Sequence, residues 1–125
     1  MSLSILLVDD EEVNLKIASM MLKKLGYQAD LATNGIEAIR ALENWFYDIV
    51  LMDIQMPEMN GLEAIKIIRQ RWHHGITIIA VTSLSSYREV CLEAGADDFL
   101  IKPVRTERLK ESIESNIPQC FATSV

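Results

Sequence analysis

Near its middle the chain carries the segment Ile49-Val-Leu-Met-Asp53-Ile-Gln-Met-Pro-Glu-Met-Asn-Gly61. Four apolar residues run into the carboxylate of Asp53, and a loop with Pro57 and Gly61 follows. This pattern predicts a buried parallel strand that ends at Asp53. Open α/β sheets hold their chemistry at the carboxyl ends of their strands. Asp53 is therefore the first candidate functional residue.

The rest of the chain repeats this unit, with short apolar runs alternating with amphipathic segments. Strands are expected over 5–8, 29–32, 49–52, 76–81 and 99–101, and a short helix over about 86–94. The remaining helices are predicted from apolar residues at helical spacing. These residues are Val13, Ile17, Met21 and Leu25; Ile36, Ile39, Leu42 and Phe46; Leu62, Ile65 and Ile68; and Leu109 with Ile113.

The punctuation of the chain supports this division, since glycines fall near the proposed helix ends and Asn34 and Asn60 can serve as N-caps. Strict alternation of strands and helices requires parallel strands with right-handed crossovers. The sequence thus predicts an α/β fold, a three-layer doubly wound sandwich with five parallel strands and five helices. We expect one domain over 1–125, with a tail over 118–125 and no output domain.

Composition narrows the classes of partner. The 125 residues carry a formal charge of −6, which argues against nucleic acid because phosphate backbones are bound by clustered Lys and Arg. Proteins are the expected partners. No apolar run approaches the roughly 18 residues of a membrane helix, and no signal peptide is recognised, so a soluble, cytoplasmic chain without membrane contact is expected. Cys91 and Cys120 are interpreted as free cysteines, with Cys91 in the core.

An acidic cluster is expected at one edge of the sheet. The first strand runs into Asp9 and Asp10 and the third ends in Asp53, so adjacent parallel strands would bring three carboxylates together. Carboxylates that lie within several ångströms (~5 Å) of one another raise one another's pKa values unless a cation lies among them. Oxygen ligands in an open site suit Mg²⁺, with Mn²⁺ as the alternative.

Two further side chains are expected at the same edge. Thr82 ends the fourth strand and offers a hydroxyl, and Lys102 follows the fifth strand and offers an ammonium. A carboxylate beside a metal, faced by a hydroxyl and a lysine, has the parts needed to accept a phosphoryl group as an aspartyl phosphate. Each residue alone has a structural explanation, and their coincidence carries the functional interpretation.

On these motifs the chain from about Ser4 to Ile117 resembles a receiver domain of two-component response regulators. The matching motifs are Val8-Asp9-Asp10, Met52-Asp53-Ile-Gln-Met-Pro57 with Gly61, Val81-Thr82-Ser83, Ala94-Gly95-Ala96-Asp97-Asp98-Phe99 and Lys102-Pro103. The resemblance implies a flavodoxin-like fold with strand order 2-1-3-4-5 and a core over about 4–117.

The resemblance also implies roles for individual residues. Asp53 would be the phosphoacceptor, and Mg²⁺ would be held by Asp10, Asp53 and the backbone carbonyl of Gln55, with Asp9 acting mainly through water. Thr82 and Lys102 would bind the phosphoryl oxygens, and the peptide bond between Lys102 and Pro103 would be cis, which an X-Pro bond allows at low cost.

In receivers of this family, a hydroxyl on the fourth strand and an aromatic ring on the fifth respond to phosphorylation. Thr82 and Phe99 occupy these two positions here. The hydroxyl moves toward the phosphate, the ring turns inward, and the face formed by the helix over about 86–94, the strand over 99–101 and the last helix is remodelled. A homodimer through this face is one expectation. The donor would be a histidine kinase or a histidine phosphotransfer domain, docking near the first helix. The segments 10–14, 54–61 and 91–98 are similar to receivers of hybrid histidine kinases, although a stand-alone regulator is the other setting.

Three other classes of protein share part of this pattern. A dinucleotide-binding domain lacks support because the first turn is acidic and has no glycines. A phosphatase of the haloacid-dehalogenase type needs a second Asp where Gln55 stands, and a carboxamide cannot transfer the proton. A docking module that works without phosphorylation remains the main alternative. The chain is not expected to be an enzyme beyond its own phosphorylation and dephosphorylation.

Overall fold

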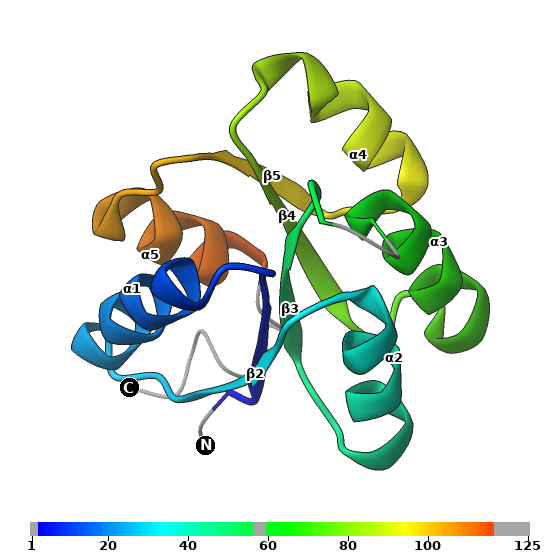
Figure 1. The fold of residues 1–125 in the computed structure, drawn as a ribbon, viewed down its shortest axis with the longest axis horizontal. Coiled ribbons are helices and arrows are strands. Elements are labelled where there is room, and N and C mark those ends of the chain that lie inside the picture. The colour runs from blue at the N-terminus through cyan, green and yellow to red at the C-terminus, as the bar shows by residue number, and fades with distance from the viewer. Residues whose placement is uncertain (1–2, 57–59, 117–125) are drawn as a thin grey trace.

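The protein is described here by a computed structural model covering residues 3–56 and 60–116. Pro57, Cys120 and the predicted tail over 118–125 lie outside these residues. Figure 1 shows alternating strands and helices from one end of the chain to the other. The elements are β1 (Ile5–Val8), α1 (Glu12–Lys24), β2 (Ala29–Ala32), α2 (Gly35–Asn44), β3 (Ile49–Asp53), α3 (Gly61–Trp72), β4 (Thr77–Thr82), the 3₁₀ helix η1 (Ser85–Tyr87), α4 (Arg88–Ala94), β5 (Asp98–Ile101) and α5 (Thr106–Asn116).

The strands form one parallel sheet in the order β2-β1-β3-β4-β5. This order confirms the predicted topology. In the register of the sheet, Val8 lies beside Met52 and Asp53 lies beside Val81. The ends of β1 and β3 are therefore neighbours, which the acidic-cluster prediction requires.

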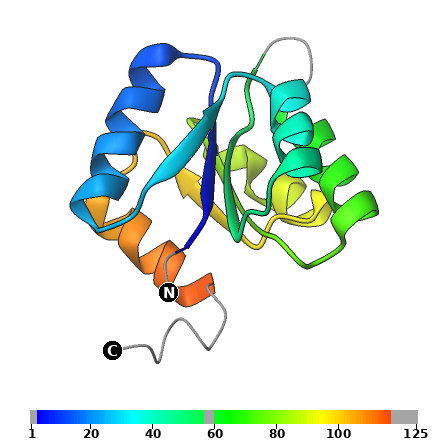
Figure 2. The same cartoon turned by 90° about the horizontal axis from the view of Figure 1, so that it is seen from below.

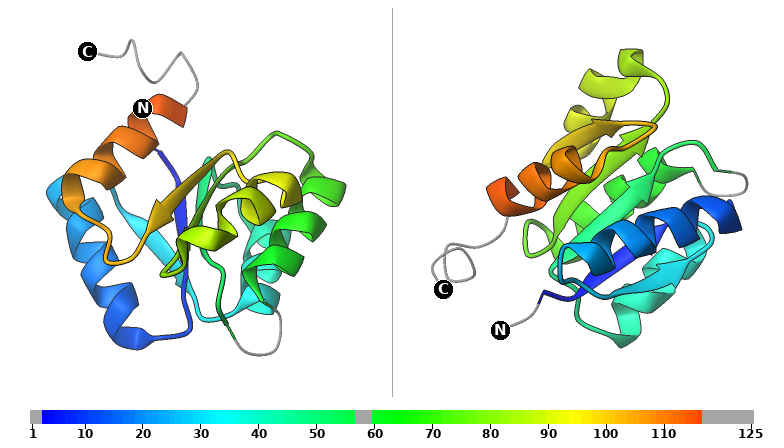
Figure 3. Two further views of the ribbon diagram at one scale, coloured as in Figure 1. Left: turned by 90° about the horizontal axis from the view of Figure 1, so that it is seen from above. Right: turned by 90° about the vertical axis from the view of Figure 1, so that its left-hand side faces the viewer.

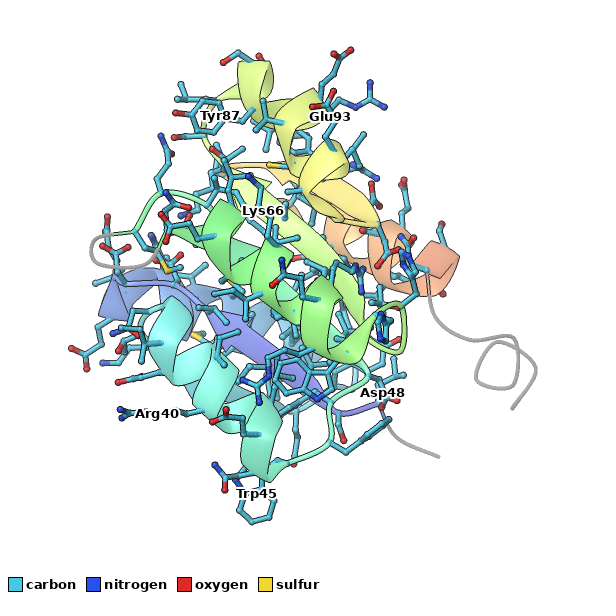
Figure 4. All side chains as sticks on the ribbon, turned by 90° about the vertical axis from the view of Figure 1, so that its right-hand side faces the viewer. Arg40, Trp45, Asp48, Lys66, Tyr87 and Glu93 are labelled. Carbon is cyan, nitrogen blue, oxygen red and sulfur yellow. The ribbon has the colours of Figure 1, made fainter. Side chains whose placement is uncertain are left out.

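The sheet forms the middle of three layers (Figure 2). α1 and α5 lie side by side on one face (Figure 3), and α2, α3 and α4 cover the other face (Figure 4). Every residue of β1 and β3 is buried because helices cover both faces of these central strands. No helix among the described residues is long and apolar enough to cross a membrane.

Two of the predicted helix faces are only partly right. On α1, Leu15 and Leu22 are buried, whereas Val13 is 65% exposed and Ile17 is 53% exposed. On α2 and the following loop, Ala38 and Leu42 are buried, whereas Ile36 and Phe46 are exposed. Both sets of residues have helical spacing, so periodicity alone cannot choose between them. The predictions for α3 and α5 are confirmed, since Ile65, Ile68, Leu109 and Ile113 are all buried.

The predicted helix starts are confirmed at two places. The Asn34 side chain accepts a hydrogen bond from the backbone N–H of Glu37 at 2.8 Å, and Asn60 does the same for Glu63 at 3.0 Å. Each bond satisfies one of the backbone donors that a helix start leaves unpaired. Asn60 in this way fixes the beginning of α3, directly after the loop that follows Asp53.

One buried cation joins three segments at the amino end of β4 and β5. The Arg69 guanidinium donates hydrogen bonds to Gly95 O, His73 O and Ile76 O, each at 2.7 Å, and to Asp97 Oδ2 at 2.6 Å. Its side chain is 10% exposed. Asp97 Oδ2 also accepts from the backbone N–H of Ile78 at 2.8 Å. We call the Arg69 side chain and these acceptors the Arg69 clasp.

Candidate functional site

Asp53 ends β3 and is only 3% exposed. The first residue of α3 lies close to the end of this strand, because Gly61 N donates to Ile54 O at 2.9 Å. A Cβ atom at Gly61 would overlap the backbone carbonyl of Asp53. A residue without a side chain is therefore required there, because the helix start is packed directly on the backbone of Asp53.

Asp9 and Asp10 follow β1 and bring two more carboxylates to this edge. One oxygen from each of Asp9, Asp10 and Asp53 can be chosen so that all three lie within 4.8 Å of one another. Asp10 is exposed, Asp9 is half-buried and Asp53 is buried, so the cluster opens outward from the end of the sheet. The predicted acidic cluster is present as the strand order requires.

Lys102 follows β5 and is the cation that faces the cluster. Its Nζ lies 3.1 Å from Asp9 Oδ2, to which it donates a hydrogen bond, and 3.1 Å from Asp53 Oδ1. The contact with Asp53 is an ion pair without hydrogen-bond geometry, and Oδ1 has no hydrogen-bond partner among the described residues. Asp9 Oδ1 in turn accepts from Glu11 N at 3.0 Å. Both oxygens of Asp9 are thus occupied, whereas Asp53 keeps one buried oxygen without a donor.

The electrostatics follow from this geometry. Burial raises the pKa of Asp53 to about 6; the Asp9 and Asp10 carboxylates also raise it, while Lys102 lowers it. Burial works against the Lys102 ammonium, but Asp53 and Asp9 outweigh that effect, so the pKa of Lys102 is raised. At neutral pH the site therefore holds three carboxylates against one ammonium, with Asp53 mostly ionised.

These residues fit a hard divalent cation. The donors are carboxylate oxygens only, which is the ligand set that Mg²⁺ takes in proteins. Oδ1 of Asp53 is buried and accepts no hydrogen bond from the described residues, so its only close contact with a charge is the ion pair with Lys102, and a second cation would add a further favourable interaction. A second positive charge would also reduce the repulsion that raises the pKa of Asp53.

Thr82 ends β4 and is completely buried. Its hydroxyl donates to Gln55 Oε1 at 3.3 Å and accepts from Leu84 N at 3.3 Å. Ser83 Oγ donates to the same Gln55 oxygen at 3.1 Å. The structure thus places Thr82 at the predicted edge, but its hydroxyl is engaged by Gln55. The hydrogen bond between the Gln55 side chain and Thr82 was not predicted, because a contact between residues 27 positions apart leaves no local pattern.

Phe99 lies in β5 and is buried. It is paired with Ala80 in the register of the sheet and belongs to the core beneath α2, α3 and α4. Because side chains alternate along a strand, Thr82 and Phe99 lie on the same face of the sheet. After β5, the peptide bond between Lys102 and Pro103 is cis.

A cavity of about 390 Å³ opens beside the site, between α1 and α5. Its walls are mainly apolar and include Leu15, Ala18 and Met21 from α1. Asp9, Asp53 and Lys102 also line it. Sequence analysis did not predict this cavity, since no single segment encodes a space between two helices.

Comparison with known proteins gives a family match. Residues 5–114 match the model of the response regulator receiver domain. Hybrid signal transduction histidine kinase B of Dictyostelium discoideum is 43% identical over 82% of this chain, which covers 6% of that protein. Probable histidine kinase 1 of Oryza sativa subsp. indica is 37% identical over 91% of the chain, which covers 15% of it. The chain therefore spans a small part of the curated relatives that it matches.

Solved structures show the same similarity. The receiver domain of a sensor histidine kinase from Pseudomonas aeruginosa PAO1, solved with a magnesium ion in its active-site cleft, is 38% identical. Its TM-score is 0.83 over 92% of this chain and 97% of that one. The response regulator TrrA from Thermotoga maritima, in complex with Mg²⁺ and BeF, is 35% identical with a TM-score of 0.84, over 92% of this chain and 98% of that one.

Proposed function

Because the chain belongs to the response regulator receiver domain family of two-component phosphorelay systems, we propose that Asp53 accepts a phosphoryl group from the phosphohistidine of a partner protein. The observation that carries this proposal is the environment of Asp53. The carboxylate is buried at a strand end, faces Lys102 at 3.1 Å and has one oxygen without a hydrogen-bond donor.

The transfer is a displacement at phosphorus. An Asp53 oxygen bonds to phosphorus while the bond from phosphorus to the imidazole nitrogen breaks, and that nitrogen keeps the electron pair and takes a proton from solvent. Asp53 must be ionised to attack, and a pKa of about 6 leaves it mostly ionised at neutral pH. The product is an acyl phosphate on the end of β3.

Lys102 and Thr82 would stabilise the phosphoryl oxygens. Lys102 already lies at hydrogen-bonding distance from the cluster, and an ammonium forms charge-assisted hydrogen bonds with phosphate. A bound Mg²⁺, held by Asp10, Asp53 and the backbone carbonyl of Gln55, would neutralise charge on the carboxylates and the phosphoryl group. Asp9 is assigned an indirect role through water, because Glu11 and Lys102 already occupy both of its oxygens.

The proposed donor is a histidine kinase or a histidine phosphotransfer domain that docks beside α1. Val13, Ile17 and Met20 are all more than half exposed on that helix. Ile17 also lines the cavity that reaches Asp53, so the apolar surface and the acceptor are continuous. Exposed apolar side chains that adjoin a polar site are typical of protein interfaces.

The proposed output is a change in the face formed by α4, β5 and α5. Thr82 would move toward the phosphoryl group, and Phe99 would respond because it shares the same face of the sheet. Val90, Leu92 and Ile101 are exposed apolar residues of α4 and β5. They give this face the character of a docking surface, and a homodimer through it is included in the proposal.

We place this receiver in a hybrid histidine kinase, because both curated relatives described above are named histidine kinases and one of them is named a hybrid kinase. The receiver unit would be a single domain over 1–125 with its core over about 4–117. In this proposal the chain catalyses only its own phosphorylation and dephosphorylation. The phosphoryl transfer to Asp53 would occur in the cytoplasm, where ATP-dependent kinases form phosphohistidine.

The test is the intact mass after incubation with Mg²⁺ and acetyl phosphate. We expect one added phosphoryl group on the native sequence and none on Asp53→Asn or without Mg²⁺. Asp48→Asn is the matched control, because Asp48 lies at the opposite end of β3 (Figure 4) and caps Ser4 N through its side chain. This variant should be labelled like the native protein.

Three outcomes would contradict the proposal. Absence of any adduct in excess Mg²⁺ would favour the docking module that works without phosphorylation. Steady hydrolysis of phosphate esters by the native protein would instead favour a phosphatase of the haloacid-dehalogenase type. Labelling that survives Asp53→Asn would assign the acceptor to another residue.

A further inference from the structure

The Gln55 side chain holds two hydroxyl groups at the edge of the site. Its Oε1 accepts from Thr82 Oγ1 at 3.3 Å and from Ser83 Oγ at 3.1 Å. A threonine hydroxyl has a single proton to donate. While that proton is directed at Gln55, it is not directed at Asp53 or at a group bound there.

The acceptor of the Thr82 hydrogen bond matters because Thr82 is buried and also contacts the loop after β4. Thr82 is fully buried, so water does not compete freely for its hydroxyl. The other side of the hydroxyl oxygen accepts from Leu84 N at 3.3 Å, in the segment that leads into η1 and α4. The Thr82 hydroxyl therefore joins the loop after β3, through Gln55, to the loop after β4.

We propose that the Gln55 carboxamide is a positioning group that holds the Thr82 hydroxyl away from Asp53 until a phosphoryl group displaces it. This inference rests on the proposed function, in which Thr82 binds a phosphoryl oxygen. Gln55 does not touch the reacting atoms. It acts through Thr82, by making the resting arrangement more favourable than it would be with an apolar side chain.

The chemistry of the two acceptors supports the exchange. A carboxamide oxygen is neutral, whereas a phosphoryl oxygen is charged and forms a hydrogen bond about twice as strong. The contact with Gln55 is also long, at 3.3 Å. When a phosphoryl group is present, the Thr82 hydroxyl therefore donates its hydrogen bond to that group. When the phosphoryl group is absent, the hydroxyl donates to Gln55. A glutamate at this position would hold the hydroxyl more strongly and would repel the phosphoryl group.

The experiment is a double-mutant cycle read by binding of beryllofluoride, a phosphoryl mimic, in excess Mg²⁺. The four proteins are the native chain, Gln55→Leu, Thr82→Ala and the double variant, with affinity measured from amide NMR titrations. Gln55 is exposed, so Gln55→Leu does not threaten folding. We expect Gln55→Leu to tighten binding about two- to fivefold, the effect of losing one weak neutral hydrogen bond. In the Thr82→Ala background it should change nothing.

A second measurement needs no phosphoryl mimic. Three-bond couplings in the metal-free protein report the χ1 rotamer of Thr82, and Gln55→Leu should broaden its rotamer distribution. Gln70→Leu is the matched control, since Gln70 is an exposed glutamine on α3. This control should alter neither the affinity nor the rotamer.

The results distinguish failure of the Gln55 proposal from failure of the proposed function. Equal tightening by Gln55→Leu with and without the Thr82 hydroxyl would overturn the role of Gln55, and so would an unchanged Thr82 rotamer. A native chain that binds no beryllofluoride in Mg²⁺ would overturn the proposed function itself.

Discussion

Strands β4 and β5 begin beside Arg69 and end beside Lys102, and these two cations have different surroundings. Arg69 faces one carboxylate, Asp97, and places its other donors on three backbone carbonyls. Lys102 faces Asp9 and Asp53 together, and it donates a hydrogen bond only to Asp9.

The difference is one of charge balance. At the amino end, one nearly buried cation meets one partly exposed anion, and each guanidinium nitrogen of Arg69 donates to a carbonyl or to Asp97, which offsets the cost of removing the cation from water. At the carboxyl end, three carboxylates meet one ammonium and a buried oxygen has no donor. The first end stabilises the folded chain, whereas the second carries an excess of negative charge that disfavours the folded chain. The residues that stabilise the fold and the candidate functional residues therefore lie at opposite ends of β4 and β5.

The largest expected effect comes from breaking the balanced end. Arg69→Met removes the cation from the Arg69 clasp, which leaves Asp97 without its ion-pair partner and three backbone carbonyls without the guanidinium donors. We expect a loss of about 3 kcal/mol in the free energy of unfolding, measured by urea denaturation. Arg71→Met is the control, because Arg71 pairs with Glu43 on the surface, with both side chains more than 40% exposed. That variant should lose less than about 1 kcal/mol. Equal losses would remove the contrast between the two ends.

An effect of similar size and opposite sign is expected at the unbalanced end. The folded pKa of Asp53 is about 6, against an ordinary value of 3.8, so the folded chain holds this proton more tightly than the unfolded chain. Stability therefore falls as the pH rises between these two values. Asp53→Asn removes that loss, and we expect it to raise the free energy of unfolding by about 3 kcal/mol at pH 8 without Mg²⁺.

The pH series provides its own control for Asp53→Asn. Below the ordinary pKa of 3.8, Asp53 is neutral in both the folded and the unfolded chain, so the gain should shrink as the pH falls through 6 and disappear at about pH 3. Adding Mg²⁺ at pH 8 should also narrow the difference, because the cation favours the charged native site. A gain that does not depend on pH would mean that repulsion at the cluster is not its cause.

The smallest effect concerns how closely the Arg69 clasp is packed. Gly95 has a φ of +121°, and a Cβ there would lie 2.5 Å from Arg69 Cγ. Gly26 also has a positive φ, +92°, but no atom lies within 4 Å of its Cβ position. We expect Gly95→Ala to lose about 1 kcal/mol more stability than Gly26→Ala, since both are strained and only one also clashes. Thermal unfolding of both variants checks this, and equal losses would show that the clash is relieved.

The fold and the acidic cluster could be predicted because they depend on local patterns. Each strand ends where an apolar run meets a polar residue, and parallel strands must gather those ends at one edge. Asp9, Asp53 and Lys102 were placed this way, and the strand order then made them neighbours. The N-caps at Asn34 and Asn60 were recognisable for the same local reason.

What could not be predicted depends on contacts between distant segments. Val13 and Ile17 have the same helical spacing as the residues that are buried, and only the position of α5 and the sheet decides which face is covered. The Arg69 clasp joins residues up to 28 positions apart, and Gln55 meets Thr82 and Ser83 across 27 and 28. Such contacts have no periodicity that a single sequence reveals.

The positions of the two tryptophans decide how this protein can be followed by fluorescence. Trp72 ends α3 and Trp45 follows α2, so both lie toward the amino edge of the sheet, away from Asp53 (Figure 4 labels Trp45). Trp72 also lies against the Arg71 guanidinium, 4.5 Å from ring centroid to Cζ. Tryptophan emission should therefore follow unfolding of the chain while responding little to phosphorylation, and an optical reporter of phosphorylation must be introduced near the carboxyl edge.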